Sequence, residues 1–290
     1  MKSLKETWWR IEAIAGNTLV EALRQRVLNV IFLFGLVLVL GSLFLTSLTF
    51  QEEFKFLKDL GYAAISITGT LVALMGAAQL IPAEIERRTL HTLLSKPVRR
   101  YEFILGKYLG LLGLITLMLL IMSLLFAGVL WAKEQLGLLG LPPAESGEEA
   151  RQMIAAVTAQ SRDLNLLQAL VLIWAKLAVV TAVAVFFSTM ATSTIFIVCT
   201  TLLVYFVGHL QSVAREVWLQ EIGGSSWLKQ GFLALVAFLI PDFQAYNLID
   251  EIIAGNAPPW AGSAELLVYS VVYVAVLLLV SSLVFEDREL

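Results

Sequence analysis

Residues 81–107 read IPAEIERRTLHTLLSKPVRRYEFILGK, the most charged run in a 290-residue chain that is 59% hydrophobic and only 15% charged. Long apolar segments flank this run on both sides, so it must lie at a membrane surface. Pro82 suits the first turn of a new helix, where its missing N–H costs nothing. Pro97 ends that helix because it pushes Lys96 out of the α region. The pattern therefore predicts a short amphipathic surface helix over residues 83–97.

The side chains of this surface helix divide into charged and apolar sets. Glu84 and Glu86 lie near the positive N-terminal end of the helix, and Arg87 and Arg88 follow. A narrow apolar stripe recurs at helical spacing and consists of Ile85, Leu90, Leu93 and Leu94. The charged side chains and the apolar stripe together predict a surface that another protein binds from outside the membrane.

The chain as a whole predicts an all-α polytopic membrane protein with a single transmembrane domain over residues 1–290. Six apolar segments are long enough to cross a hydrocarbon core about 30 Å thick. They are residues 29–48, 61–81, 106–131, 173–190, 195–209 and 264–284. The third begins with Gly106, Gly110 and Gly113, whose spacing suits close helix packing.

Three further segments are interpreted as interfacial. Residues 1–28 predict an amphipathic helix in the membrane plane, although a soluble helix packed on another element is an open alternative. Phe232–Ile240 is too short to cross and is closed by Pro241, which predicts a re-entrant or interfacial region over 226–253. Lys176 is expected to snorkel to the interface beside Trp174, which would make residues 164–172 a separate approach helix, and contact of Lys176 with substrate is the open alternative.

The distribution of lysine and arginine predicts the orientation. Residues 1–28, 83–107 and the C-terminal tail together carry twelve, whereas residues 49–60, 133–165 and 210–263 carry seven over much longer loops. Loops rich in lysine and arginine stay on the cytoplasmic side. We therefore expect a multi-pass protein of the plasma (inner) membrane with both termini and the surface helix in the cytoplasm.

Several kinds of chemistry are excluded by composition. His91 and His209 are the only histidines and fall on opposite faces in this topology, which excludes a zinc protease of the H-E-x-x-H kind. The sequence contains no G-x-S-x-G and no glycine-rich nucleotide loop. Cys199 is the only cysteine, so neither an internal disulfide nor a cysteine metal cage can form. We expect no catalytic, cofactor or metal site on this chain and no nucleic-acid partner, so any energy source must come from another chain.

A resemblance to a known family is concentrated in the charged run. The segments Glu84-Ile85-Glu86-Arg87-Arg88-Thr89-Leu90 and Leu93-Leu94-Ser95-Lys96-Pro97-Val98-x-Arg100, followed by Gly106-Lys107, resemble the signature of type-2 ABC export permeases, specifically their NosY-like branch. Phe187-Ser188 and Pro241-Asp242-Phe243 extend the likeness.

The resemblance implies a coupling helix at residues 83–97 that docks in a groove of an ABC ATPase. It implies two copies of that ATPase, which hold ATP and Mg²⁺, and a second permease copy, either identical or similar. The implied coupling residues are Glu84, Glu86, Arg87, Arg88, Leu90, His91, Leu93, Leu94, Pro97 and Arg100.

Other interpretations stay open at this point. The cations of the charged run could serve only to fix topology and bind anionic lipid headgroups. The chain could be a membrane scaffold or assembly factor with the same fold, or an intramembrane enzyme. The mixed apolar composition suggests a lipid-like, peptide or hydrophobic cargo, and the sequence does not specify the substrate further.

Overall fold

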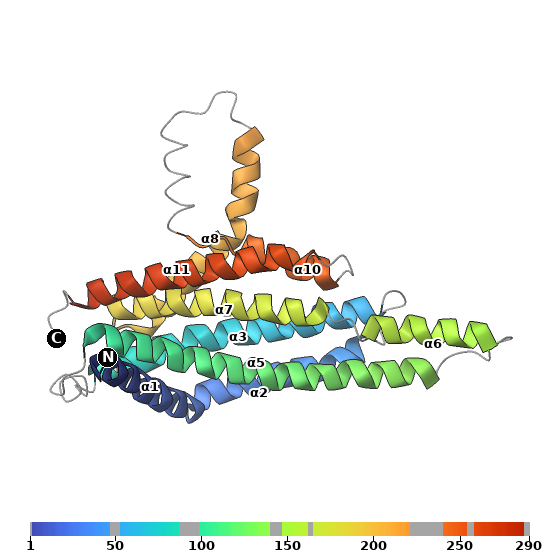
Figure 1. Ribbon diagram of the computed structural model, residues 1–290, viewed down its shortest axis with the longest axis horizontal. Coiled ribbons are helices and arrows are strands. Elements are labelled where there is room, and N and C mark those ends of the chain that lie inside the picture. The colour runs from blue at the N-terminus through green and yellow to red at the C-terminus, as the bar shows by residue number, and fades with distance from the viewer. Residues whose placement is uncertain are drawn as a thin grey trace.

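The computed structural model describes residues 2–46, 53–86, 99–139, 147–161, 165–220, 240–253 and 258–286. Within these ranges every regular element is a helix: α1 (Lys2–Leu23), α2 (Arg26–Thr46), α3 (Glu53–Glu86), α5 (Arg100–Leu139), α6 (Gly147–Ser161), α7 (Asn165–Met190), α8 (Thr194–Gln220), the 3-10 helix η1 (Gln244–Asn247), α10 (Leu248–Ile253) and α11 (Trp260–Glu286). The predicted all-α polytopic fold is confirmed (Figure 1).

Six of the described helices are long and apolar enough to cross a membrane. The membrane-length stretches are Arg26–Thr46, Glu53–Gln79, Arg100–Leu139, Asn165–Met190, Thr194–Gln211 and Trp260–Phe285. The start of α1 and the end of α11 lie at the same end of the bundle, and α6 lies at the opposite end (Figure 1). A chain that crosses the membrane an even number of times ends on the side where it began, which explains this arrangement.

Helix α7 is the centre of the bundle, and α3, α5, α8, α10 and α11 all contact it. Its buried alanines, among them Ala175, Ala182 and Ala184, let neighbouring helices approach closely. Gly69 of α3 lies directly against the side chain of Leu177. The outer helices α2, α8 and α11 instead expose apolar side chains, as expected of surfaces that meet lipid tails. These include Val30, Leu33, Phe34, Ile195, Phe196, Val268, Val271 and Leu279.

The expectation that a new helix begins at Pro82 is wrong, because Pro82 lies inside α3. The helix runs without interruption from Glu53 to Glu86 with Pro82 inside it. Proline has no N–H, so the carbonyl four residues earlier, that of Ala78, loses its helical partner. The Thr194 hydroxyl in the first turn of α8 donates to that carbonyl over 3.3 Å. A neighbouring threonine can compensate for a proline in a membrane helix in this way, so the helix continues.

Two other element boundaries differ from those expected. The third membrane helix begins at Arg100 rather than Gly106, which places Arg100 and Gly106 on one rigid element. The expected approach helix at 164–172 is not separate where it is described, because α7 begins at Asn165 and continues to Met190. The far half of α5 pairs with α6, where the Ser161 hydroxyl donates to Glu134 over 2.5 Å.

The chain returns to the bundle after α8 through residues 240–253. The Phe243 amide donates to the Gly208 carbonyl over 3.2 Å, and a side chain at Gly208 would lie 2.4 Å from the Pro241 carbonyl. Phe243 and Tyr246 are buried, and α10 packs on α3 and α7. The first part of the predicted re-entrant region, residues 226–239, lies outside the described residues.

Candidate functional site

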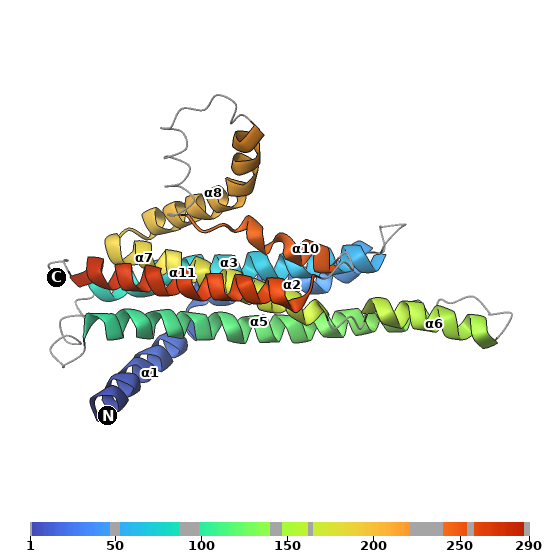
Figure 2. The ribbon, with the colours of Figure 1, turned by 45° about the horizontal axis from the view of Figure 1, so that its top comes forward.

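In the chain, α5 follows directly on the charged connection. Helix α1 packs against α5 at an angle (Figure 2). Two glycines make this contact possible. A side chain at Gly106 would lie 2.7 Å from the side chain of Ile14, and one at Gly110 would lie 2.7 Å from the Ala15 carbonyl. Gly113, the third predicted packing glycine, is less crowded, since a side chain there would lie 4.0 Å from Leu19.

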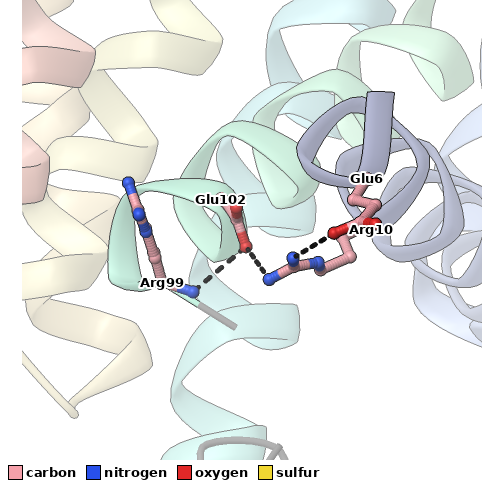
Figure 3. Close-up of polar contacts among 4 residues, drawn as sticks. All are labelled: Glu6, Arg10, Arg99 and Glu102. Carbon is pink, nitrogen blue, oxygen red and sulfur yellow. Dashed lines mark hydrogen bonds and ion pairs between the residues drawn. The ribbon is translucent and has the colours of Figure 1, made fainter. Parts of the chain in front are cut away.

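A buried carboxylate stands at the centre of this contact. Glu102 is fully buried in the first turn of α5, and its Oε2 accepts a hydrogen bond from the Arg99 amide over 3.1 Å. This is the carboxylate half of a capping box, three residues after the position that precedes the helix. The same oxygen lies 3.4 Å from Nη1 of Arg10 on α1, and Arg10 also approaches Glu6 at 4.0 Å (Figure 3). The positive end of α5 and the Arg10 guanidinium together stabilise the carboxylate.

A second ion pair joins the same two helices one turn further along. Lys107 is only 1% exposed, and its Nζ lies 3.6 Å from Oε2 of Glu21 on α1. The ammonium also lies 5.8 Å from the centre of the Phe103 ring, a distance that suits a cation–π contact. Helices α1 and α5 are thus held by two pairs of opposite charge, and the Gly106 and Gly110 contacts lie along the same interface.

The first residue of α5 attaches it to α11 as well. Nη1 of Arg100 donates to the Phe285 carbonyl over 2.6 Å, close to the end of α11. The rings of Phe103 and Phe285 are stacked with their centres 5.9 Å apart. We call this set of contacts, formed by Arg10, Arg100, Glu102, Lys107 and Phe285, the α5 junction.

Of the predicted coupling residues, Arg100 belongs to the α5 junction. Glu84 and Glu86 lie in the last turn of α3, and Arg100 is the first residue of α5. The others, Arg87, Arg88, Leu90, His91, Leu93, Leu94 and Pro97, lie outside the described residues. The coupling helix predicted at 83–97 therefore stays a prediction from residue 87 onward, while its first residues continue α3.

Arg10, Glu21, Glu102 and Lys107 were missed by sequence reasoning. Ninety-two positions separate Arg10 from Glu102 in the chain, and no local sequence pattern predicts that the two residues are in contact. One local signal was available: a glutamate three residues after Arg99 has capping-box spacing.

Lys176 differs from the expected interfacial, snorkelling lysine because it lies inside the bundle. It is 8% exposed and lines a cavity among α3, α7, η1 and α10. Within the described ranges, no group of three or more His, Cys, Asp or Glu side chains is placed to hold a metal ion.

Six of the described helices are long and apolar enough to cross a membrane, which defines a polytopic membrane protein, and polar contacts join the start of α5 to α1 and α11. The sequence matches the family model described as "ABC-2 family transporter protein" over residues 13–290, and the chain belongs to that family. Among curated proteins, none matches it significantly. The chain is therefore a membrane permease component of an ABC transporter, a transport subunit and not itself an enzyme. The family implies an ABC ATPase as partner.

Proposed function

We propose that this chain is the permease of an ATP-driven exporter of the NosY-like branch, and that residues 83–97 receive the motion of the ATPase. The complex contains two ABC ATPase subunits, which bind ATP and Mg²⁺, and a second permease, identical or similar. It lies in the plasma (inner) membrane, and both permease termini face the cytoplasm. The family membership and the resemblance of residues 84–107 to that branch support this proposal.

The α5 junction is the observation that carries the proposal. Residues 87–98 connect α3 directly to α5. Glu102 links the first turn of α5 to α1, and Arg100 links it to α11. A displacement of the connection would thus act on α1, α3, α5 and α11 together, which is what coupling to an ATPase requires.

The apolar stripe of the coupling segment provides the test. Buried anchors at protein interfaces often cost about 2 kcal/mol or more when they are truncated, and about 1.4 kcal/mol corresponds to tenfold in affinity. The double substitution Leu90→Ala with Leu94→Ala should therefore weaken co-purification of the ATPase at least tenfold while membrane insertion stays normal. Glu86→Ala should reduce transport more than binding.

A matched control removes two leucines from the far end of the molecule. Leu136 and Leu139 are exposed near the end of α5 that is remote from the junction, and their replacement by alanine should leave ATPase binding unchanged. Full ATPase affinity and normal transport in the Leu90 and Leu94 double variant would reject the coupling role. A chain that inserts but binds no ATPase in any form would favour the scaffold alternative.

A further inference from the structure

A second polar site lies apart from the α5 junction, nearer the end of the bundle where α10 packs on α3. It is a cavity of about 290 Å³ enclosed by α3, α7, η1 and α10. Pockets close to this size commonly hold small ligands and are oriented by a few polar groups. Its lining includes one lysine, two aspartates and two tyrosines: Lys176, Asp59, Asp250, Tyr62 and Tyr246.

Lys176 supplies the positive charge inside this cavity. Its side chain is 8% exposed, and its Nζ lies 5.3 Å from the centre of the Tyr205 ring of α8. In the part of the chain that the structure describes, Lys176 has no ion pair and no hydrogen bond, and besides Tyr205 its charge acts on the imidazole of His209 on α8. An ionisable side chain within a membrane-spanning helix is costly, and such residues commonly mark a ligand or ion pathway.

The two aspartates form the outer rim. Asp59 lies near the start of α3 and Asp250 lies on α10, and both are exposed. Gly69 of α3 contacts Leu177, the neighbour of Lys176. Lys176 therefore lies about 15 Å further along the bundle than Asp59, at 1.5 Å per helical residue. The Nζ of Lys176 lies against the Tyr205 ring of α8, so the lysine charge lies inside the bundle and not at the rim.

The tyrosines of the lining are already engaged by the protein. The Tyr62 hydroxyl donates to the Leu166 carbonyl over 3.0 Å, and the Tyr246 hydroxyl contacts the Ser270 hydroxyl. Burial raises the pKa of Tyr246 to about 12, so its phenol stays neutral near pH 7. The charged side chains of the lining lie at two levels, with Lys176 inside and Asp59 and Asp250 at the rim, and Asp59 already interacts with the protein.

We propose that this cavity binds a small zwitterionic group, with its phosphate or carboxylate at Lys176 and its ammonium at Asp250. A simple anion would have to pass the Asp250 carboxylate, and a simple cation would meet the buried ammonium of Lys176. A zwitterion complements both levels. This inference rests on the proposed function only in making the bound group a transported solute or lipid headgroup.

Phosphoethanolamine and its two halves test the charge pattern. The full-length permease, without ATPase, is placed in nanodiscs of phosphatidylglycerol and titrated calorimetrically. Phosphoethanolamine should bind saturably, and inorganic phosphate or ethanolamine alone should bind at least tenfold more weakly. Lys176→Met should weaken phosphoethanolamine binding at least tenfold, whereas Lys176→Arg should retain it. Lys133→Met, which changes a lysine outside the cavity lining, should have no effect.

Substitutions at the rim keep the test valid if Lys176→Met fails to fold. Asp250→Asn should weaken binding several-fold, and Glu251→Gln, at the adjacent exposed carboxylate, should not. Phosphatidylethanolamine added to the nanodiscs identifies the source: competition with the soluble probe indicates a lipid headgroup, and its absence indicates a soluble zwitterion. Two results overturn the proposal. The first is that neither phosphoethanolamine nor phosphatidylethanolamine binds saturably. The second is that inorganic phosphate alone binds as tightly as phosphoethanolamine while Asp250→Asn leaves phosphoethanolamine binding unchanged. Failure here together with normal ATPase co-purification would leave the proposed function intact.

Discussion

The Thr194 hydroxyl donates to the Ala78 carbonyl, which is the oxygen that Pro82 leaves without a helical partner. This hydrogen bond of 3.3 Å joins α8 to α3 at the point where α3 was expected to end. Because a buried carbonyl without a donor is costly, the continuity of α3 depends on a residue from another helix.

Removing the Thr194 hydroxyl should therefore be costly only while Pro82 is present. Thr194→Val should lower the free energy of unfolding by about 1 kcal/mol. Pro82→Ala restores an N–H that can reach the Ala78 carbonyl, so Thr194→Val should cost much less in that background. Thermal unfolding of the four proteins in detergent measures this coupling. Equal costs of Thr194→Val in both backgrounds would show that the hydroxyl does not compensate for the proline.

The Arg10 side chain should matter mainly because Glu102 is buried. Arg10→Met leaves a buried carboxylate whose remaining partner in the described part of the chain is the Arg99 amide, which should destabilise the protein by about 1–3 kcal/mol. Replacing both residues, as Arg10→Met with Glu102→Leu, should be less harmful than Arg10→Met alone, since the uncompensated charge is gone. Unfolding midpoints give the comparison, and a double variant less stable than Arg10→Met would contradict it.

The glycines of α5 should differ sharply in their tolerance of alanine. Gly110→Ala brings a methyl group against the Ala15 carbonyl, and overpacking of this kind typically costs about 1–3 kcal/mol. Gly113→Ala is the matched control, because its nearest neighbour would lie at an ordinary contact distance of 4.0 Å. The midpoint of thermal unfolding should fall for the first variant and not for the second. Similar values for the two would indicate that α1 shifts freely on α5.

The orientation inferred from the lysine and arginine distribution can be tested with a thiol reagent that does not cross membranes. Cys199 is exposed and is first replaced by alanine. A cysteine at Ser146 should then react in intact cells, and a cysteine at Ser95 should react only after permeabilisation. Labelling of the cysteine at position 95 in intact cells would show that the orientation is the reverse of the predicted one.

The sequence predicted the number and approximate position of the membrane helices because apolar length is a local property. It failed at Pro82 because the compensating hydroxyl lies 116 residues from Ala78. It missed the partnership of Arg10 and Glu102 for the same reason, since only the crossing of α1 over α5 brings them together. Lys176 was assigned to the interface because nothing local indicates that η1 and α10 close a cavity over it.

Helix α5 is a nearly straight rod of 40 residues (Figure 2), about 60 Å long at 1.5 Å per residue. That is about twice the thickness of a hydrocarbon core, so the rod behaves as a lever whose arm extends well past the bilayer. A tilt of about 5° pivoting at Arg100 would carry the tip near Leu139 through about 5 Å, with no bending of the helix. Small rotations at one surface would thus be amplified at the other, where α6 travels with the tip.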